Sequence, residues 1–199
     1  MWLSYLLIGL VRMLVGATPR YAAISPTKKQ AIYFANHSSH IDTVALWSAL
    51  PPAQRSRTRP VAALDYWGRS RMRRYIALKG LNAVLIDRTH QTIQSDPLQP
   101  LSDALRQGDS LIIFPEGTRQ TDPVPGAFKS GLYHLSQAFP EVELVPVYLE
   151  NLHRSMPKGY SVPVPMICTV RFGLPIEHKI SEKKEDFLNR ARQAVIDLS

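Results

Sequence analysis

The sequence lacks the features that define several large classes of protein. Cys168 is its only cysteine, so an internal disulfide is excluded and a cytoplasmic setting fits best. There is no phosphate-binding P-loop, no G-x-G-x-x-G fingerprint and no zinc-finger spacing, which removes support for nucleotide binding. Internal repeats, low-complexity tracts and the G-x-S-x-G nucleophile elbow are also missing. These absences argue against disulfide scaffolds, repeat arrays and serine hydrolases built on that elbow.

The composition describes one globular domain with an excess of positive charge. The chain has 199 residues, of which 45% are hydrophobic and 20% are charged, as is ordinary for a single domain. The formal net charge of +8 favours an acidic partner: anionic lipid, an acidic carrier protein, a phosphorylated substrate or nucleic acid.

Arginines gather in one part of the chain, where Tyr66, Trp67 and Tyr75 are interleaved with them. The cluster consists of Arg55, Arg57, Arg59, Arg69, Arg71, Arg73 and Arg74. Two interpretations stay open for this stretch: a solvated basic face, or a surface that meets an anionic partner.

Residues 1–17 are nearly all apolar, with Arg12 as the one charged side chain and Trp2 near the start. A helix of this length reaches about 25 Å, which is shorter than the hydrocarbon core of about 30 Å. The pattern favours a helix that lies in or dips into one leaflet, with Arg12 extending to the headgroups. The alternative is a helix packed on the protein's own core.

Arg20, Lys28 and Lys29 follow this apolar start and favour a cytoplasmic position for its flank. We therefore expect residues 1–20 to be a hydrophobic membrane-associating segment and residues 21–199 to be one α/β domain. The expected location is the cytoplasmic face of the inner membrane.

Short apolar runs alternate with amphipathic stretches through the rest of the chain. The runs predict strands over 31–35, 61–64, 84–86, 111–114, 143–149 and 166–172. Helices are expected over 41–50, 66–78, 97–107, 130–139 and along the tail that contains Phe187 to Leu198. This alternation predicts an α/β fold with a mostly parallel sheet flanked by helices on both faces. Active sites in such sheets lie at the C-terminal ends of the strands.

Three residues are expected to cap helices or to interrupt a strand. Asp96 is expected to cap the helix that begins at Pro97, and Ser181 is a possible cap of the closing helix. Pro146 lies inside an expected strand and predicts an edge or a bulge there, unless its missing amide hydrogen is not needed.

The motif Asn36 to Asp42, N-H-S-S-H-I-D, follows the first expected strand directly. His37 is the residue type that takes and returns a proton near neutral pH. Asp42 is spaced to curl back, accept a hydrogen bond from the other imidazole nitrogen and stabilise the imidazolium. Ser38 and Ser39 are too close in sequence to His37 to be assumed to serve as its nucleophile, so the simplest inference is that the substrate supplies the hydroxyl.

A second motif, Phe114 to Arg119, also follows an expected strand. Gly117 lets backbone approach a ligand closely, and Arg119 is suited to bind phosphate with two parallel hydrogen bonds. Arg88 leaves a third strand and is a further candidate for the same phosphate.

A metal site is the alternative for the first motif, since His37, His40 and Asp42 are all residue types that bind zinc. No third block of His or Cys has ligand spacing. Acid-base chemistry without a metal is therefore the preferred interpretation, with His40 expected at the surface or beside the site.

Taken together, the motifs resemble the signature blocks of the glycerolipid acyltransferase family, which includes 1-acylglycerol-3-phosphate acyltransferases and other lysophospholipid acyltransferases. The resemblance covers about residues 30 to 150. Besides the two motifs it includes Ile86-Asp87-Arg88, the run around Pro146, and Lys129-Ser130-Gly131. The chain has Asn82 and Leu85 where the family usually has glycine and phenylalanine.

The resemblance implies transfer of an acyl group from an acyl-carrier-protein or coenzyme A thioester to the hydroxyl of a membrane lysophospholipid. With 1-acylglycerol-3-phosphate as acceptor, the product is phosphatidic acid. His37 is then the catalytic base and Asp42 its partner, with no metal and no cofactor beyond the acyl thioester. The residues expected to bind substrate are Ser39, Arg88, Glu116, Gly117, Thr118, Arg119 and Lys129.

Attack on a thioester places negative charge on the carbonyl oxygen, which backbone amides after His37 or basic side chains would stabilise. Two other functions remain as alternatives: an acyl thioesterase or lipid hydrolase that uses water, and a non-catalytic basic module that binds membrane or nucleic acid. Strong salt-dependent binding would mark the nucleic-acid module. No recognition helix or RNA-binding aromatic motif supports it.

Overall fold

The computed structural model describes most of the chain. The described residues are 6, 9, 16, 18–22, 29–39, 41–87, 96–122, 124–155, 164 and 167–199. Most of the expected membrane-associating segment, together with His40 and Arg88, lies outside them. Among the residues that are described, none belongs to a helix with the length and apolar character needed to cross a membrane.

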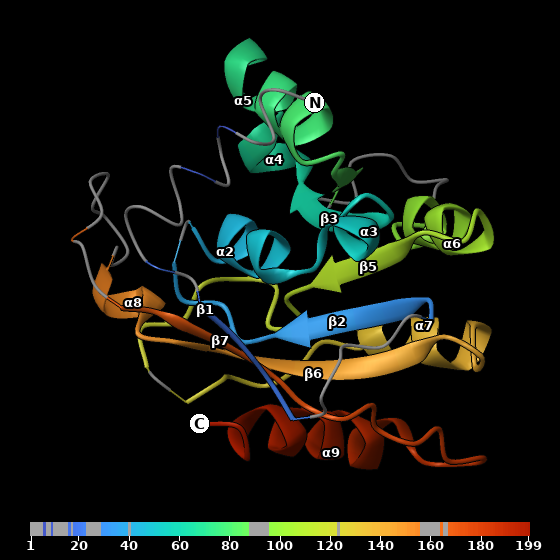
Figure 1. Ribbon diagram of the computed structural model, residues 1–199. Coiled ribbons are helices and arrows are strands. Elements are labelled where there is room, and N and C mark those ends of the chain that lie inside the picture. The colour runs from blue at the N-terminus through green and yellow to red at the C-terminus, as the bar shows by residue number, and fades with distance from the viewer. Residues whose placement is uncertain are drawn as a thin grey trace.

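A twisted sheet of seven strands runs through the described chain (Figure 1). The strands are β1 (Thr18–Tyr21), β2 (Ala31–Ala35), β3 (Thr58–Ala63), β4 (Val84–Ile86), β5 (Ser110–Ile113), β6 (Glu143–Glu150) and β7 (Thr169–Phe172). Their order across the sheet is β1-β7-β6-β2-β5-β3-β4. Each neighbouring pair is parallel except β6 and β7. The expected mostly parallel α/β sheet is confirmed.

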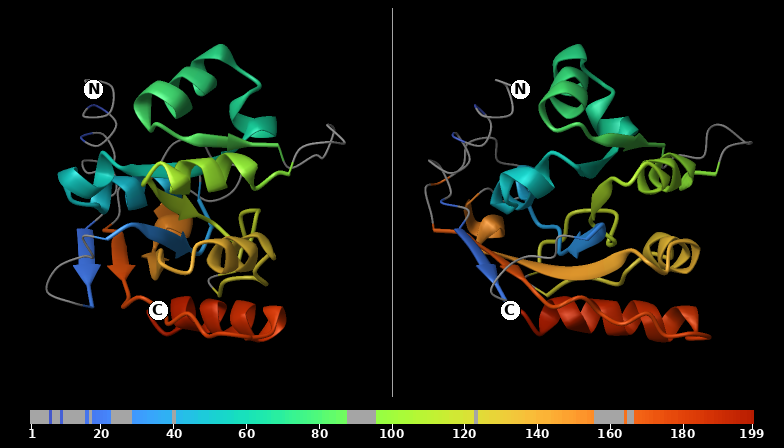
Figure 2. Two further views of the ribbon diagram at one scale, coloured as in Figure 1. Left: turned by 90° about the vertical axis from the view of Figure 1, so that its right-hand side faces the viewer. Right: turned by 45° about the vertical axis from the view of Figure 1, so that its right-hand side comes forward.

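Helices cover both faces of this sheet (Figure 2). They are α2 (Asp42–Ala49), α3 (Pro52–Arg55), α4 (Leu64–Trp67), α5 (Arg71–Tyr75), the π-helix η1 (Ile76–Gly80), α6 (Gln99–Arg106), α7 (Gly131–Ala138), α8 (Leu152–Ser155) and α9 (Lys184–Ile196). On one face α2 and η1 contribute to the core; on the other, α6, α7 and α9 do.

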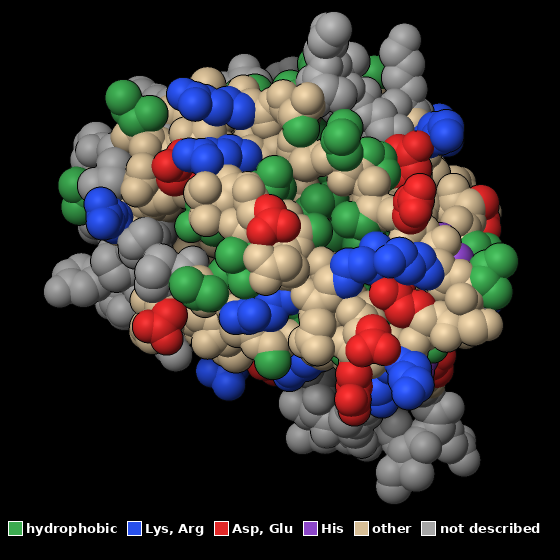
Figure 3. All heavy atoms as spheres, turned by 90° about the horizontal axis from the view of Figure 1, so that it is seen from below, with side chains coloured by type: hydrophobic (Ala, Val, Ile, Leu, Met, Phe, Trp, Pro, Cys, Tyr) green, Lys and Arg blue, Asp and Glu red, His purple; other side chains and the backbone are tan. Residues whose placement is uncertain are grey.

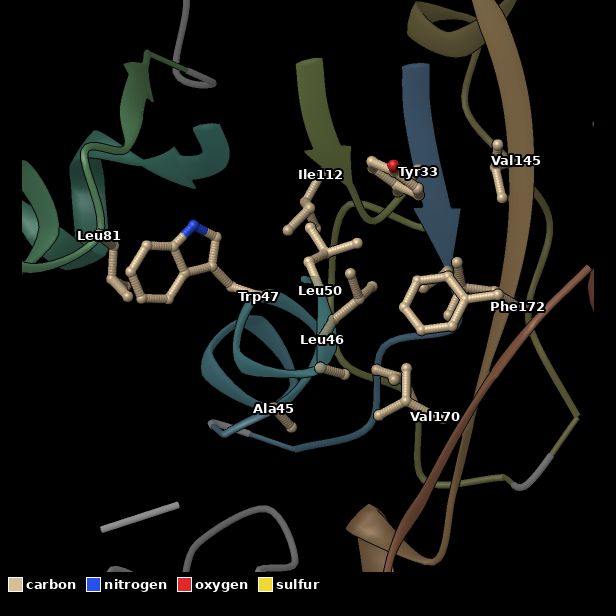
Figure 4. Packing of buried hydrophobic residues seen from close by; sticks show 14 of the residues in the cluster. Tyr33, Ala45, Leu46, Trp47, Leu50, Leu81, Ile112, Val145, Val170 and Phe172 are labelled. Atoms are coloured by element: carbon tan, nitrogen blue, oxygen red, sulfur yellow. The ribbon is translucent and has the colours of Figure 1, made fainter. Parts of the chain in front are cut away.

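Strand β2 explains why both faces need cover, because all five of its residues are buried. Tyr33 points into the α2 side of the core, whereas Ile32 and Phe34 belong to the side of α6, α7 and α9. Figure 4 shows Leu46 and Trp47 of α2 among the residues of the first side. An apolar run with no polar alternation is what a strand buried on both faces requires.

The expected helix over 66–78 is wrong as a single element. Gly68 donates its N–H to the Leu64 carbonyl at 2.7 Å and closes α4, and Ser70 is extended with φ of −133°. The chain then continues through α5 into η1, whose wider turns are frequent at functional sites. Likewise the strand expected over 61–64 begins earlier, at Thr58, and Leu64 already starts α4.

The termini of other elements also differ from expectation. Strand β1 was not expected, and it takes residues 18–20 of the N-terminal segment into the sheet. Ser181 has φ of 63° and does not cap α9, which follows Lys183 instead. Asp96 does accept a hydrogen bond, from the Leu98 N–H at 2.9 Å, but in a turn just before α6.

Pro146 lies in an interior strand, so of the expected edge or bulge the structure excludes the edge. Its carbonyl accepts the Gly173 N–H at 2.9 Å, and the next bridge joins Leu144 to Ile176. The chain between these contacts is one residue longer on the Gly173 side, which makes a bulge. The bulge interrupts the ladder where proline has no hydrogen to donate.

Candidate active site

The two sequence motifs meet because the strands that precede them are neighbours. β2 and β5 pair in parallel with Phe34 opposite Ile113, so both motifs leave the same edge of the sheet. The His37 N–H donates to Glu116 Oε1 at 2.7 Å, and the Gln120 N–H donates to the His37 carbonyl at 2.8 Å. The expectation that both motifs begin at strand ends is confirmed.

His37 and Asp42 form a direct hydrogen-bonded pair. His37 Nδ1 lies 2.9 Å from Asp42 Oδ2, which also accepts the N–H groups of Ser38 at 2.6 Å and Ser39 at 2.8 Å. Asp42 is fully buried, whereas the His37 side chain is 21% exposed. Because Nδ1 is held by the carboxylate, Nε2 is the imidazole nitrogen left for a substrate.

Two further contacts restrict the position of His37. Its ring stacks on Phe114, with centroids 4.3 Å apart and an interplanar angle of 22°. Asn36 fixes the end of β2 to β6, since Asn36 Nδ2 donates to the Leu149 carbonyl and Asn36 Oδ1 accepts the Leu149 N–H. The sequence motif contained Asn36 and Phe114, but only the fold reveals these contacts.

Glu116 connects the two motifs from a buried position. Its Oε1 accepts the His37 N–H and its Oε2 accepts the Gly126 N–H at 2.8 Å. Burial raises the pKa of the Glu116 carboxyl, although the Gly126 and His37 amides oppose the rise. The carboxylate therefore orients the loop that carries His37, and direct contact with substrate stays a prediction for Glu116.

Two basic side chains lie beside this loop. Gly117 has φ of 70°, and a Cβ there would lie 2.8 Å from Lys129 Cε and 2.9 Å from Lys129 Nζ. A larger residue at Gly117 would thus be strained and would displace Lys129. Arg119 Nη1 is buried, and no described atom accepts a hydrogen bond from it. A cation without an acceptor is ready to bind an anion.

A cavity of about 680 Å³ connects these residues. His37, Gly117, Thr118, Arg119 and Lys129 all line it. Its apolar walls come mainly from β3, β4, β5, α6 with the residue before it, and α7, and include Val61, Ile86, Leu98, Leu101, Ile113, Leu132 and Leu135. The polar lining also includes Arg69 and the carboxylates of Asp65, Asp87 and Asp96. The site therefore combines the base His37 and charged side chains with an apolar compartment of a size usual for small-molecule sites.

Other candidates lie apart from the cavity. Ser39 is fully buried in the turn before α2 and does not line it. The amides of Ser38 and Ser39 already donate to Asp42, so they are not the oxyanion donors that the sequence suggested. Basic side chains remain for that role. Within the described residues no group of three or more His, Cys, Asp or Glu side chains is arranged to hold a metal ion.

Asn82 stands where the family usually has glycine, and its backbone conformation explains why asparagine fits there. Asn82 has φ of 52°, in the left-handed region where glycine is favoured and asparagine is tolerated. Its carbonyl accepts a hydrogen bond from Arg59 Nε at 3.0 Å. The turn that leads into β4 therefore keeps its shape without glycine, and Leu85 packs against the core on the α2 face.

Comparison with known proteins agrees with the fold and the site. Residues 20–150 match the family described as Acyltransferase. The match covers more than half of the chain, and the protein belongs to this acyltransferase family.

Individual relatives have more specific names. The 1-acyl-sn-glycerol-3-phosphate acyltransferase of Limnanthes douglasii is 29% identical over 182 residues, which are 87% of this chain and 59% of that protein. The enzyme of the same name from Chlamydomonas reinhardtii is 29% identical over 175 residues, 86% of this chain and 49% of that protein. The chain thus spans about half to three fifths of the length of these curated relatives.

A solved structure has a similar fold. It is the crystal structure of the 1-acyl-sn-glycerophosphate (LPA) acyltransferase PlsC from Thermotoga maritima, with a TM-score of 0.72 at 18% identity. The similarity covers 98% of this chain and 79% of the other. At this identity the likeness establishes the shared fold.

Proposed function

We propose that this protein is an O-acyltransferase that moves a fatty acyl group from a thioester to the hydroxyl of a lysophospholipid. The acceptor is 1-acylglycerol-3-phosphate and the product is phosphatidic acid. The observation that carries the proposal is the His37–Asp42 pair, joined at 2.9 Å beside a cavity that Arg119 and Lys129 line together with apolar side chains. The names of the relatives support the choice of acceptor.

In the proposed reaction, His37 Nε2 takes the proton of the acceptor hydroxyl while Asp42 stabilises the imidazolium. The hydroxyl oxygen attacks the thioester carbonyl carbon, and a new C–O bond forms. The tetrahedral intermediate then collapses, the C–S bond breaks, and the imidazolium returns its proton to the leaving sulfur. No protein nucleophile is needed, because the acceptor supplies it.

Arg119 and Lys129 bind the phosphate of the acceptor in this proposal. Both line the cavity together with His37, and Arg119 Nη1 is buried without an acceptor among the described atoms. Acyl chains occupy the apolar walls, and a basic side chain of this group stabilises the carbonyl oxyanion. Thr118 lines the same cavity, while Arg88 remains a candidate on its motif alone.

The proposed donors are acyl carrier protein and coenzyme A thioesters, with no other cofactor and no nucleic-acid partner. The proposed location is the cytoplasmic face of the inner membrane, where the lysophospholipid acceptor resides. The net charge of +8 suits either anionic lipid or an acidic carrier protein.

Replacement of the base tests the proposal directly. His37→Ala is expected to reduce acyl transfer by at least about 10²-fold, because general base catalysis is lost. Purified protein is incubated with acyl thioester and lysophosphatidate, and phosphatidic acid is measured by mass spectrometry. His178→Ala is the control and should retain activity, because His178 contacts Gln137 and does not line the cavity. Full activity of a folded His37→Ala variant would refute the mechanism.

The same assay separates a transferase from a hydrolase. A thioesterase releases free fatty acid with or without lysophospholipid, whereas the transferase consumes the thioester only with acceptor. Arg119→Ala should raise the KM for lysophosphatidate about 10- to 100-fold, as expected for loss of charged hydrogen bonds. It should change the KM for an uncharged monoacylglycerol much less. Equal effects on both acceptors would exclude Arg119 as the phosphate ligand.

A further inference from the structure

The segment of residues 64–80, made of α4, α5 and η1, projects from the β3–β4 edge of the sheet. Figures 1 and 2 show α4 and α5 at the opposite end of the molecule from α9. None of the residues of α4 and α5 is buried. Met72 is 70% exposed, Tyr75 53% and Leu78 38%. Neighbouring large apolar side chains in water mark a surface that meets another phase or molecule.

The charge of this projection is predominantly positive, with Asp65 at the start of α4 as its one acidic side chain. Residues 66–86 contain no acidic side chain, and their basic side chains are Arg69, Arg71, Arg73, Arg74 and Lys79. Arg71, Arg74 and Lys79 are exposed, and within the described part of the chain they form no ion pair.

The first half of the arginine-rich stretch is different. Arg55 is buried and donates to the carbonyls of Ser48 and Leu50. Arg59 lies 3.6 Å from an Asp109 carboxylate oxygen. These arginines hold the domain together. A folding role accounts for them and does not account for Arg71, Arg74 and Lys79.

The exposed side chains of α5 and η1 are arranged by helical spacing. Ala77 and Gly80 face the protein and are buried, while Arg71, Tyr75 and Leu78 follow one another at steps of four and three residues on the outer face. Apolar side chains flanked by cations on a convex helical surface are the pattern of an interfacial element.

This projection also forms part of the cavity. Tyr66, Trp67 and Arg69 line the same cavity as His37. The Arg73 guanidinium carbon lies 4.8 Å from the centroid of the Tyr66 ring, which connects the cavity wall to α5. A surface that bound α5 would therefore lie next to a wall of the cavity.

We propose that the segment of residues 64–80 docks on an anionic bilayer, with Met72, Tyr75 and Leu78 among the headgroups. Arg71, Arg74 and Lys79 then contact lipid phosphates. A convex projection with exposed apolar tips suits a fluid bilayer better than it suits the surface of a folded acidic protein. The proposal adds to the proposed function a specific docking element, separate from residues 1–17.

Charge reversal tests the electrostatic part with the full chain. Arg71→Glu/Arg74→Glu is expected to lower the partition coefficient on vesicles of phosphatidylcholine and phosphatidylglycerol about 30-fold, since each basic residue near an anionic surface contributes a several-fold factor. Lys179→Glu/Lys184→Glu changes the net charge by the same amount near α9. Figure 3 shows acidic and basic side chains intermixed on that face. This control should bind like wild type. Equal loss in both variants would overturn the proposal in favour of a net-charge effect.

A fluorophore tests insertion. Cys168 is fully buried, so Met72→Cys provides the thiol that a polarity-sensitive label reaches. Its emission should shift to the blue on anionic vesicles, while a label at Leu174→Cys, 61% exposed in the native protein, should not shift. No shift at position 72 would refute the docking.

Two more measurements separate the possible outcomes. If the Arg71→Glu/Arg74→Glu variant lost binding to acyl carrier protein while keeping vesicle binding, the surface would belong to the carrier. Turnover in detergent micelles should be close to wild type for this variant. Loss of catalysis by wild type in the same micelles would instead refute the proposed function, and so the two failures are distinguishable.

Discussion

The junction of the two motifs, residues 36–42 with 114–119, contrasts with the projection of residues 64–80. In the junction, Asp42 is 0% and Glu116 3% exposed, and backbone amides bind both carboxylates. In the projection, Tyr75 is 53% exposed, and no ion pair within the described residues involves Arg71, Arg74 or Lys79. Proton transfer needs fixed atoms, and buried hydrogen bonds fix them. Contact with a fluid surface needs exposed side chains that adapt.

The largest effect is expected in the junction, from Asp42→Asn. An amide at this position no longer stabilises the imidazolium and presents an NH₂ group toward backbone donors, so kcat should fall about 10³-fold. The assay is phosphatidic acid formation at saturating acceptor. Asp103→Asn on the exposed side of α6 is the control, and a kcat equal to that of the control would break the assignment of Asp42 as the partner of His37.

Glu116→Gln should destabilise the junction. The carboxylate accepts two backbone N–H groups, and an amide side chain places a donor against one of them, which costs about 2 kcal/mol of unfolding free energy. Urea unfolding followed by circular dichroism measures this loss. Glu185→Gln, exposed in the first turn of α9, should change the unfolding free energy by no more than about 0.5 kcal/mol. Equal losses of unfolding free energy in the two variants would show that Glu116 does not stabilise the junction.

Cys168 provides a pH-dependent comparison. Burial, with a smaller contribution from the Asp42 charge, raises the pKa of its thiol to about 11 from 9.0. The folded state therefore retains this proton longer than the unfolded state, and the stability contribution present below pH 9 is lost as pH rises toward 11. Relative to Cys168→Ala, wild type should lose about 1 kcal/mol of unfolding free energy between pH 8 and pH 10. If the difference in unfolding free energy between wild type and Cys168→Ala stayed constant over this pH range, the pKa of the thiol would not be raised in the folded state.

The smallest effect is expected in the projection. Tyr75→Ser removes a ring that is 53% exposed, so the unfolding free energy should change by less than about 0.5 kcal/mol. Thermal unfolding of this variant beside Glu116→Gln gives the contrast between the regions. A loss of unfolding free energy above 1 kcal/mol, on the order of a core substitution, would show that the projection also stabilises the fold. The two regions would then not differ in this respect.

Much of the fold was predictable because burial leaves a strong trace in sequence. The runs that became β2, β5 and β6 are apolar enough to stand out, and the motif at His37 could be assigned to a strand end from β2 alone. Strand β1 left no such trace, since it contains Pro19 and Arg20 and lies half-exposed at the sheet's edge. The break between α4 and α5 depends on the extended backbone at Ser70, which composition does not encode.

The site was predictable to a similar degree. His37 and Asp42 are close in sequence, so a turn alone brings them together and local reasoning sufficed. The role of Glu116 was not predictable, because its partners are backbone amides of His37 and Gly126 that only the sheet order makes adjacent. Ser39 was assigned to substrate binding from its place in the motif, and the structure puts it in the buried turn instead.

The pairing of β1 with β7 sets the order in which the chain can fold during synthesis. Thr18 is in register with Thr169, and β7 is the neighbour to which β1 is hydrogen-bonded in the described sheet. At ribosomal rates of about 5–20 residues per second, β1 waits for many seconds before its partner emerges. Until then β1 has no strand to pair with, so this edge is the last part of the described sheet to form.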